Sequence, residues 1–140
     1  MRRVFIDTNV FIYAFEYPNS NSAVILGLLN RGEIEAVVSE RVVHEVVRYF
    51  ERHHSIALAR LFRRYLHEVC VIVSRQNVLD AMEAYRRSIN EKDLEQLAVT
   101  KKLRIPHLIS YDRDFLGVNE YITPRAFALL MKRRAAETEF

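Results

Sequence analysis

The feature that most constrains the fold is the alternation of short, apolar, β-prone runs with longer segments whose apolar residues recur at helical spacing. The first run, Val4–Ile6, ends abruptly at the polar residues Asp7-Thr8-Asn9, as a buried strand does at its carboxyl end. We expect further strands at residues 34–38, 69–73, 107–110 and 121–122. Because parallel strands need long crossover connections, this alternation predicts an α/β fold with a mostly parallel sheet covered on both faces.

Residues with side-chain oxygens mark where the expected helices begin. The expected starts are the polar cluster at residues 18–21, Ser39, Ser55, Asn77, Asn90 and Thr123-Pro124. Asp93 lies three residues after Asn90, so the pair resembles a capping box. Gly32 and Pro106 are expected to follow the ends of two of these helices.

The length of 140 residues, half of them hydrophobic, is enough to bury one core and short for two, so we expect one domain over residues 1–140. The lone Cys70 lies in an apolar run, where we expect it in the core, and it suits a reducing compartment. Asp7 interrupts the first apolar stretch too early for a signal peptide, and no later stretch approaches the ~20 apolar residues of a membrane helix. The sequence therefore predicts a cytoplasmic protein that does not enter a membrane.

Two acids stand at the ends of expected strands. Asp7 follows the first strand, and Asp112 follows the strand at residues 107–110. The carboxyl ends of parallel strands share one edge of a sheet, so these two carboxylates are expected to be neighbours. Carboxylates are hard ligands that suit Mg²⁺ or Mn²⁺, and no Cys/His spacing favours zinc. The pair His53-His54 is interpreted as a solvated helix end.

Local patterns leave several roles open. Asp7 could instead cap the helix or turn that follows it, and Asn9 could bond either Asp7 or the local backbone. Glu45 and Glu40 flank the same apolar helix stripe, and periodicity does not choose between them. Asp93 has an equally good explanation as an acid in the first turn of a helix, which stabilises the helix by about 0.3–1 kcal/mol.

The chain resembles the PIN domain, a nuclease fold found in many prokaryotic toxins of toxin–antitoxin pairs. Four motifs in order carry the resemblance over nearly the whole chain. They are Phe5-Ile6-Asp7-Thr8-Asn9, the helix from Ser39 with its inward Glu45, Asp93 with Ala98 about one turn later, and Ser110-x-Asp112-x-Asp114-Phe115. The second motif selects Glu45 over Glu40. Residues 88–92 are more polar than the family's usual approach to the third acid.

The resemblance implies a three-layer α/β/α sandwich with about five strands and a metal-dependent ribonuclease. It implies Asp7, Glu45, Asp93 and Asp112 as catalytic residues. The implied ligands of Mg²⁺ or Mn²⁺ are Asp7, Asp93, Asp112 and Asp114. Thr8, Asn9 and Ser110 are implied as supporting residues. Hydrolysis of RNA to a 5′-phosphate and a 3′-hydroxyl, a homodimer and a small antitoxin partner are also implied.

Charge agrees with an RNA substrate. The chain has 21 Lys and Arg against 18 Asp and Glu, and withdrawing five acids into one cleft leaves 13, so the remaining surface carries a net +8. Such a surface attracts a polyanion, although an ordinary solvated surface with a mild basic excess is the alternative. The aromatic residues Tyr13, Phe15 and Tyr17 are interpreted as packing residues, with base stacking as the less favoured reading.

Two other functions remain open. A PIN-like RNA- or protein-binding module with little catalysis would keep the same acids. A phosphatase of the haloacid dehalogenase kind also begins with a strand and an aspartate, but it needs an acid where this chain has Asn9. For the homodimer, the helices at residues 55–66 and 77–85 are the expected surfaces, because neither carries a proposed site residue. A toxin and an RNA-processing enzyme are not separable from the sequence.

Overall fold

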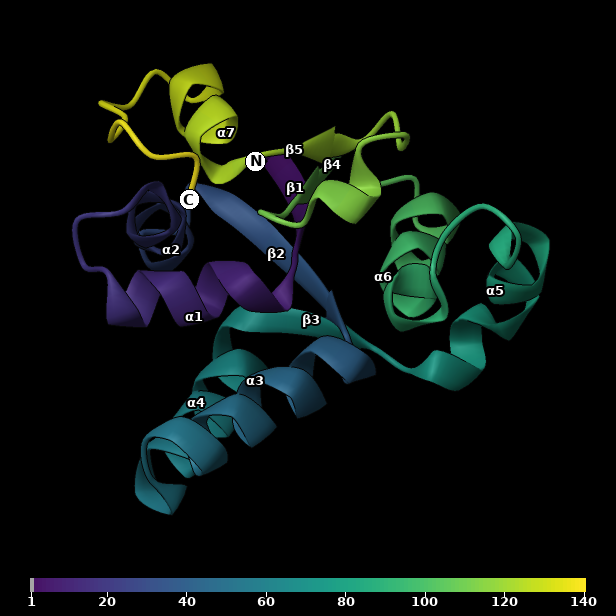
Figure 1. Cartoon of the computed structure of the whole chain (residues 1–140), viewed down its shortest axis with the longest axis horizontal. Helices are drawn as coiled ribbons and strands as arrows, with labels where there is room; N and C mark the ends of the chain where they lie inside the picture. Colours follow the sequence, from purple (N-terminus) through teal and green to yellow (C-terminus); the bar gives the residue numbers. More distant parts are fainter. Residues whose placement is uncertain (1) are drawn as a thin grey trace.

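In the computed structural model, which describes residues 2–140, five strands form a parallel sheet in the order β3-β2-β1-β4-β5. The strands are β1 (Arg2–Ile6), β2 (Ile34–Ser39), β3 (Cys70–Val73), β4 (His107–Ile109) and β5 (Tyr121–Ile122). Strand β1 lies at the centre, between β2 and β4 (Figure 1). The carboxyl ends of β1 and β4 are therefore neighbours, with Ile6 paired to Ile109.

Seven helices flank the sheet. They are α1 (Thr8–Glu16), α2 (Asn21–Asn30), α3 (Glu40–His53), α4 (Ile56–Val69), α5 (Leu79–Tyr85), α6 (Glu91–Lys102) and α7 (Pro124–Leu130). Helices α1, α2 and α7 lie on one side of the sheet and α5 and α6 on the other, while the α3–α4 hairpin projects near β3 (Figure 1). This arrangement confirms the expected three-layer α/β/α sandwich. Short 3-10 turns at Arg75–Val78 and Arg113–Phe115 complete the connections.

Helix starts confirm most of the caps expected from the sequence. The hydroxyls of Ser20, Ser39, Ser55 and Thr123 each accept a hydrogen bond from the backbone N–H three residues later. Each bond satisfies a donor that the first helical turn leaves without an intrahelical partner. These four helix starts were therefore readable from local sequence.

Helix α1 directly follows Asp7, as the capping interpretation of Asp7 allowed, although its residues are rich in the β-branched and aromatic types that favour strands. Two local expectations were wrong. The helix expected from Asn77 begins earlier, as a 3-10 turn capped by Ser74, and becomes α-helical at Leu79. Asn90 makes no side-chain cap, because its amide donates to Asp114 Oδ2 at 3.2 Å.

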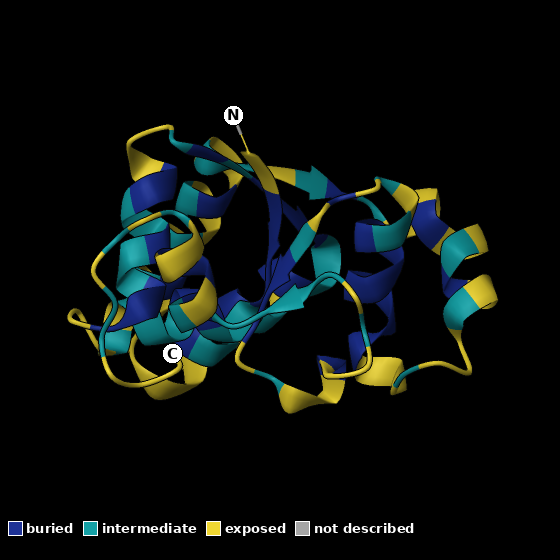
Figure 2. Ribbon diagram, turned by 90° about the horizontal axis from the view of Figure 1, so that it is seen from above, coloured by how far each residue is buried: buried dark blue, intermediate teal, exposed yellow. Residues whose placement is uncertain are grey.

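The core lies on both sides of the central strands. Val4, Phe5 and Ile6 of β1 are fully buried, and Phe50 of α3 stacks on Phe62 of α4 with ring centroids 4.1 Å apart. Figure 2 shows buried residues in the strands and on the helix faces turned toward them, with exposed residues on outer helix faces and loops. Cys70 is half-buried at the start of β3 and packs against this core rather than inside it. Within residues 2–140, no helix is long and apolar enough to cross a membrane.

Candidate active site

Asp7 stands where β1 ends and α1 begins, and its side chain is almost completely buried. Its Oδ1 accepts a hydrogen bond from the backbone N–H of Thr8 at 2.8 Å, so it does cap α1. Its Oδ2 accepts a hydrogen bond from the Ser110 hydroxyl at 2.7 Å. The capping role and a role in the site are therefore compatible, because each uses a different oxygen of the carboxylate.

Ser110 connects the two strand ends that the sheet brings together. Its hydroxyl donates to Asp7 and accepts hydrogen bonds from the Asn9 amide at 3.2 Å and from the Asp112 backbone N–H at 2.9 Å. Asn9 also accepts from the backbone N–H of Tyr111 at 3.0 Å. Both open readings of Asn9 are thereby resolved: it bonds backbone, but across the sheet edge rather than locally, and it supports Asp7 through Ser110.

Three further carboxylates gather beside this connection. Asp93 in the first turn of α6, Asp112 after β4 and Asp114 in the following 3-10 turn each offer an oxygen, and these oxygens lie within 4.8 Å of one another. Asp93 is buried, whereas Asp114 is largely exposed. The cluster is therefore open to solvent on one side and supported by buried structure on the other.

A lysine lies among these three acids. Lys92 Nζ is 2.9 Å from Asp93 Oδ2, 3.1 Å from Asp112 Oδ2 and 2.9 Å from Asp114 Oδ2. Partial burial lowers the pKa of Lys92, but the contacts with the three carboxylates outweigh that effect and raise its pKa overall. The ammonium therefore stays charged where it lies.

Glu45 reaches the site from α3. Its Oε1 accepts a hydrogen bond from the Thr8 hydroxyl at 2.8 Å, and Arg41 Nε lies 3.6 Å from its Oε2. Glu40, the alternative on the same helix, instead accepts from the backbone N–H of Arg75 at 2.7 Å. The structure thus places Glu45, and not Glu40, next to the residue that follows Asp7.

Burial and mutual repulsion perturb two of the acids. Burial, with a smaller contribution from the nearby carboxylates of Glu45 and Asp93, raises the pKa of Asp7 to about 6, against the lowering effect of the Ser110 and Thr8 hydrogen bonds. Burial also raises the pKa of Asp93, partly offset by its contact with Lys92. Burial disfavours the ionised forms of Asp7 and Asp93, and a nearby cation would favour them.

The donor set fits a hard divalent cation. Asp93, Asp112 and Asp114 supply only carboxylate oxygens, the ligands that Mg²⁺ and Mn²⁺ prefer. Asp7, which the sequence placed in the same ligand set, lies outside this group and is joined to it through Ser110. His53 and His54 stand at the exposed end of α3, as expected of a solvated helix end, and His54 Nε2 pairs there with Glu16 at 2.9 Å.

Sequence reasoning missed Lys92 and Glu95. Glu95 is buried on α6, where it accepts from the Arg41 backbone N–H at 2.8 Å and from the Arg75 side chain at 3.3 Å. It thereby joins the start of α3 to α6. Helix α6 is buried nearly all round, so its sequence has no apolar periodicity that would mark Glu95 as a buried position. Only the fold shows which groups Glu95 contacts.

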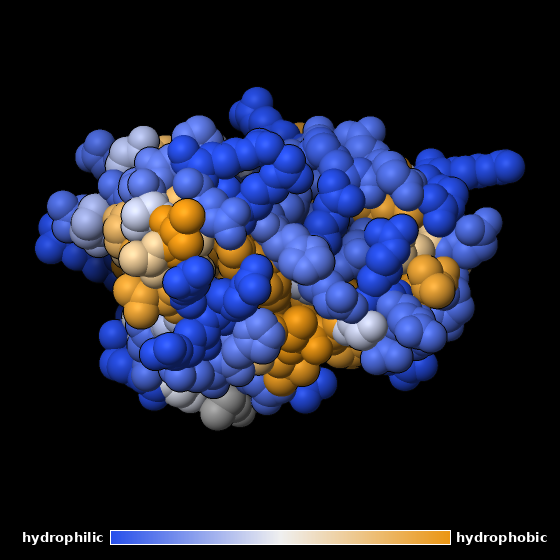
Figure 3. All heavy atoms as spheres, turned by 90° about the horizontal axis from the view of Figure 1, so that it is seen from below, coloured by the Kyte–Doolittle hydropathy of each residue, from blue (hydrophilic) through white to orange (hydrophobic). Residues whose placement is uncertain are grey.

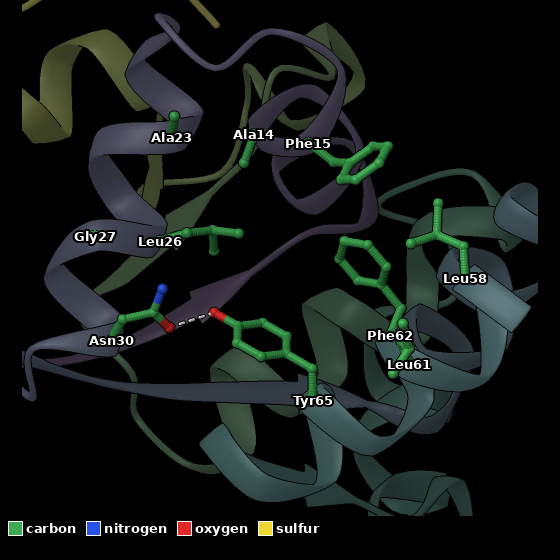
Figure 4. Close-up of a pocket in the computed structure, with 10 residues that line it drawn as sticks. All are labelled: Ala14, Phe15, Ala23, Leu26, Gly27, Asn30, Leu58, Leu61, Phe62 and Tyr65. Carbon is green, nitrogen blue, oxygen red and sulfur yellow. Dashed lines mark hydrogen bonds between the residues drawn. The ribbon is translucent and has the colours of Figure 1, made fainter. Parts of the chain in front are cut away.

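An apolar pocket of about 450 Å³ lies between α1, α2 and α4, and no acidic residue lines it. In the close-up of Figure 4, Phe15 from α1 and Phe62 from α4 approach each other, and the Tyr65 hydroxyl donates to Asn30 Oδ1 at 2.6 Å. Figure 3 shows hydrophobic patches on the face from which α3 and α4 project. Phe15 packs here, while Tyr13 and Tyr17 pack against Phe140, as expected of packing residues.

The fold and the acids together define a class: an α/β/α protein whose acidic centre lies at the carboxyl ends of its central parallel strands. Residues 4–121 match the sequence model of the PIN domain. The chain belongs to the PIN domain family, and the haloacid dehalogenase alternative is therefore wrong. No curated protein matches this chain.

Several solved structures share the fold, and three of them illustrate it. A toxin–antitoxin complex from Klebsiella pneumoniae has 21% sequence identity and a TM-score of 0.69, with 86% of this chain and 97% of that chain covered. VapBC2 from Rickettsia felis, bound to a fragment of promoter DNA, has 14% sequence identity and a TM-score of 0.67. The match covers 86% of this chain and 96% of that chain. VapC20 from Mycobacterium tuberculosis, described as a toxin that cleaves the sarcin–ricin loop, has 15% sequence identity and a TM-score of 0.65. The match covers 84% of this chain and 95% of that chain.

Proposed function

We propose that this chain, as one nuclease domain over residues 1–140, is a divalent-cation-dependent endoribonuclease and the toxin of a toxin–antitoxin pair. The observation that carries the proposal is the cluster of Asp93, Asp112 and Asp114 in a PIN-domain chain, with Asp7 joined to it through Ser110 and Glu45 bonded to Thr8 beside Asp7. The toxin and toxin–antitoxin structures that share its fold support the biological role.

In this proposal Asp93, Asp112 and Asp114 hold Mg²⁺ or Mn²⁺, with Asp7 contributing directly or through water. When bound, the cation supplies charge for the phosphate and favours ionised water as the nucleophile. Thr8 holds Oε1 of Glu45, and Oε2, which lies 3.6 Å from Arg41 Nε, would orient the attacking water or accept its proton. Ser110 and Asn9 keep Asp7 and Asp112 in register.

The proposed reaction is hydrolysis. The water oxygen bonds to phosphorus while the bond from phosphorus to the 3′ oxygen breaks. The water proton passes to Glu45, and the departing 3′ oxygen takes up a proton from solvent. The products are a 5′-phosphate and a 3′-hydroxyl, as the family resemblance implies.

A cleavage assay with Asp7→Asn tests the function. RNA cleavage by the wild type is expected with Mg²⁺ or Mn²⁺ and absent in EDTA. The variant, folded by circular dichroism, is expected to lose more than about 100-fold, beyond the 10–100-fold typical of residues that only support metal ligands. Asp80→Asn is the matched control, because Asp80 pairs with Lys102 on the surface. Equal cleavage in EDTA, or by Asp7→Asn, contradicts the proposal and favours the binding-module alternative.

The proposed partners are RNA, a second copy of the chain and a small antitoxin protein, in the cytoplasm. A short reading frame beside the gene, whose product binds this chain and relieves growth arrest on its expression, is the expected sign of a toxin. Cleavage without growth arrest, in a gene with no such neighbour, would instead favour a role in RNA processing.

A further inference from the structure

Lys92 occupies the centre of the cluster that the proposed function reserves for a cation. Its three contacts, to Asp93, Asp112 and Asp114, are each 3.1 Å or shorter, and an ammonium has three donors, one for each carboxylate. Among residues 2–140, no other basic side chain forms an ion pair with these three acids. One ammonium thus contacts every carboxylate of the cluster.

The ammonium and a divalent cation compete for the same oxygens. Mg²⁺ draws carboxylate oxygens to about 2.0–2.1 Å, well inside the lysine contacts of 2.9 to 3.1 Å. Two cations at the centre of one small carboxylate set also repel each other. Filling of the cluster by a divalent cation therefore requires that Lys92 leave it.

The structure allows the lysine to leave without unfolding. The Lys92 side chain is 52% exposed, and it starts from the first turn of α6 at the surface. The acids are held more firmly: the Asp93 side chain is 5% exposed, Asp112 accepts from the Asp114 backbone N–H at 2.9 Å, and Asp114 accepts from Asn90. The lysine is the most exposed member of the cluster, so it can turn out to solvent while the carboxylates stay behind as ligands.

We propose that Lys92 is a built-in counterion that competes with the divalent cation for Asp93, Asp112 and Asp114, and so sets the cation concentration at which the site fills. This inference rests on the proposed function for the identity of the cation. Lys92 keeps the carboxylates together when the cation is scarce, and the site becomes competent when the cation displaces it. If the lysine occupies the cluster about nine-tenths of the time, it weakens apparent cation affinity about tenfold.

Mn²⁺ binding, measured by calorimetry without RNA, tests the competition. Lys92→Met removes the charge and keeps the length of the side chain, and it is expected to bind Mn²⁺ about tenfold more tightly than the wild type. Its melting temperature without metal is expected to fall, since three carboxylates then repel without a counterion. Lys102→Met is the matched control, because it removes one lysine from the same helix but from a pair with Asp80.

Should Lys92→Met fail to fold without metal, Lys92→Gln keeps polar contacts without the charge and is expected to bind more tightly as well. Unchanged or weaker Mn²⁺ binding by folded Lys92 variants overturns the inference, and so does the absence of Mn²⁺ binding by every variant. Cleavage of RNA without the affinity shift overturns this inference alone. The affinity shift without cleavage overturns the proposed function alone.

Discussion

Replacing Asp7 by asparagine should make the metal-free protein more stable at neutral pH, although it should inactivate the site. Asp7 is buried, and its pKa rises from 3.8 to about 6 on folding. Between these values the folded state binds more protons than the unfolded state, so stability falls as pH rises through this window. The shift of about two pKa units, at 1.36 kcal/mol each, corresponds to a penalty of about 3 kcal/mol above pH 6.

Asparagine cannot ionise, so Asp7→Asn escapes this penalty. The variant should match the wild type near pH 4 and exceed it by as much as about 3 kcal/mol at pH 8, less whatever the altered Ser110 hydrogen bond costs. Urea unfolding in EDTA, followed by circular dichroism at several pH values, measures the difference directly. EDTA matters, because a bound cation would stabilise the ionised carboxylate of the wild type.

Asp80→Asn supplies a control of opposite sign. The Lys102 hydrogen bond lowers the pKa of this exposed aspartate, so its charge favours the folded state above pH 4 and its removal should not stabilise. A stability difference between Asp7→Asn and the wild type that is flat from pH 4 to pH 8, or that grows toward acid, would refute the reasoning from burial.

Two further outcomes are expected. Ser110→Ala removes the hydroxyl that joins Asp7 to Asn9, and it should lower the free energy of unfolding in urea by about 1–3 kcal/mol and reduce RNA cleavage. Ser88→Ala, at an exposed serine, should do neither. Equal effects of the two substitutions would argue against the role of Ser110 in joining these residues. Leu61 is 59% exposed on α4 at the apolar pocket, and Leu61→Lys should convert the expected homodimer to a monomer, as measured by light scattering at micromolar concentration. Leu116→Lys, on another exposed leucine, should leave the dimer intact. A monomeric wild type at that concentration would contradict the dimer prediction.

The sequence by itself determined the fold class and the ends of most elements. Strand signals such as Val4–Ile6 and caps such as Ser39 and Thr123 are local, because a strand repeats every two residues and a cap bonds three residues ahead. The strand-end acids Asp7 and Asp112 also follow from sequence, since parallel strands end at one edge.

Only the tertiary structure decided how these residues meet. The Asp7–Ser110 bond joins positions 103 apart in the chain, because the sheet order places β4 beside β1. Helical periodicity did not choose between Glu40 and Glu45, and the packing of α3 is what places Glu45 against Thr8. Asn90 bonds Asp114 rather than its own helix. No local pattern singled out Lys92, because its position among three carboxylates arises only where α6 and the end of β4 come together. Local patterns reach about one helical turn, whereas these contacts depend on packing between elements distant in sequence.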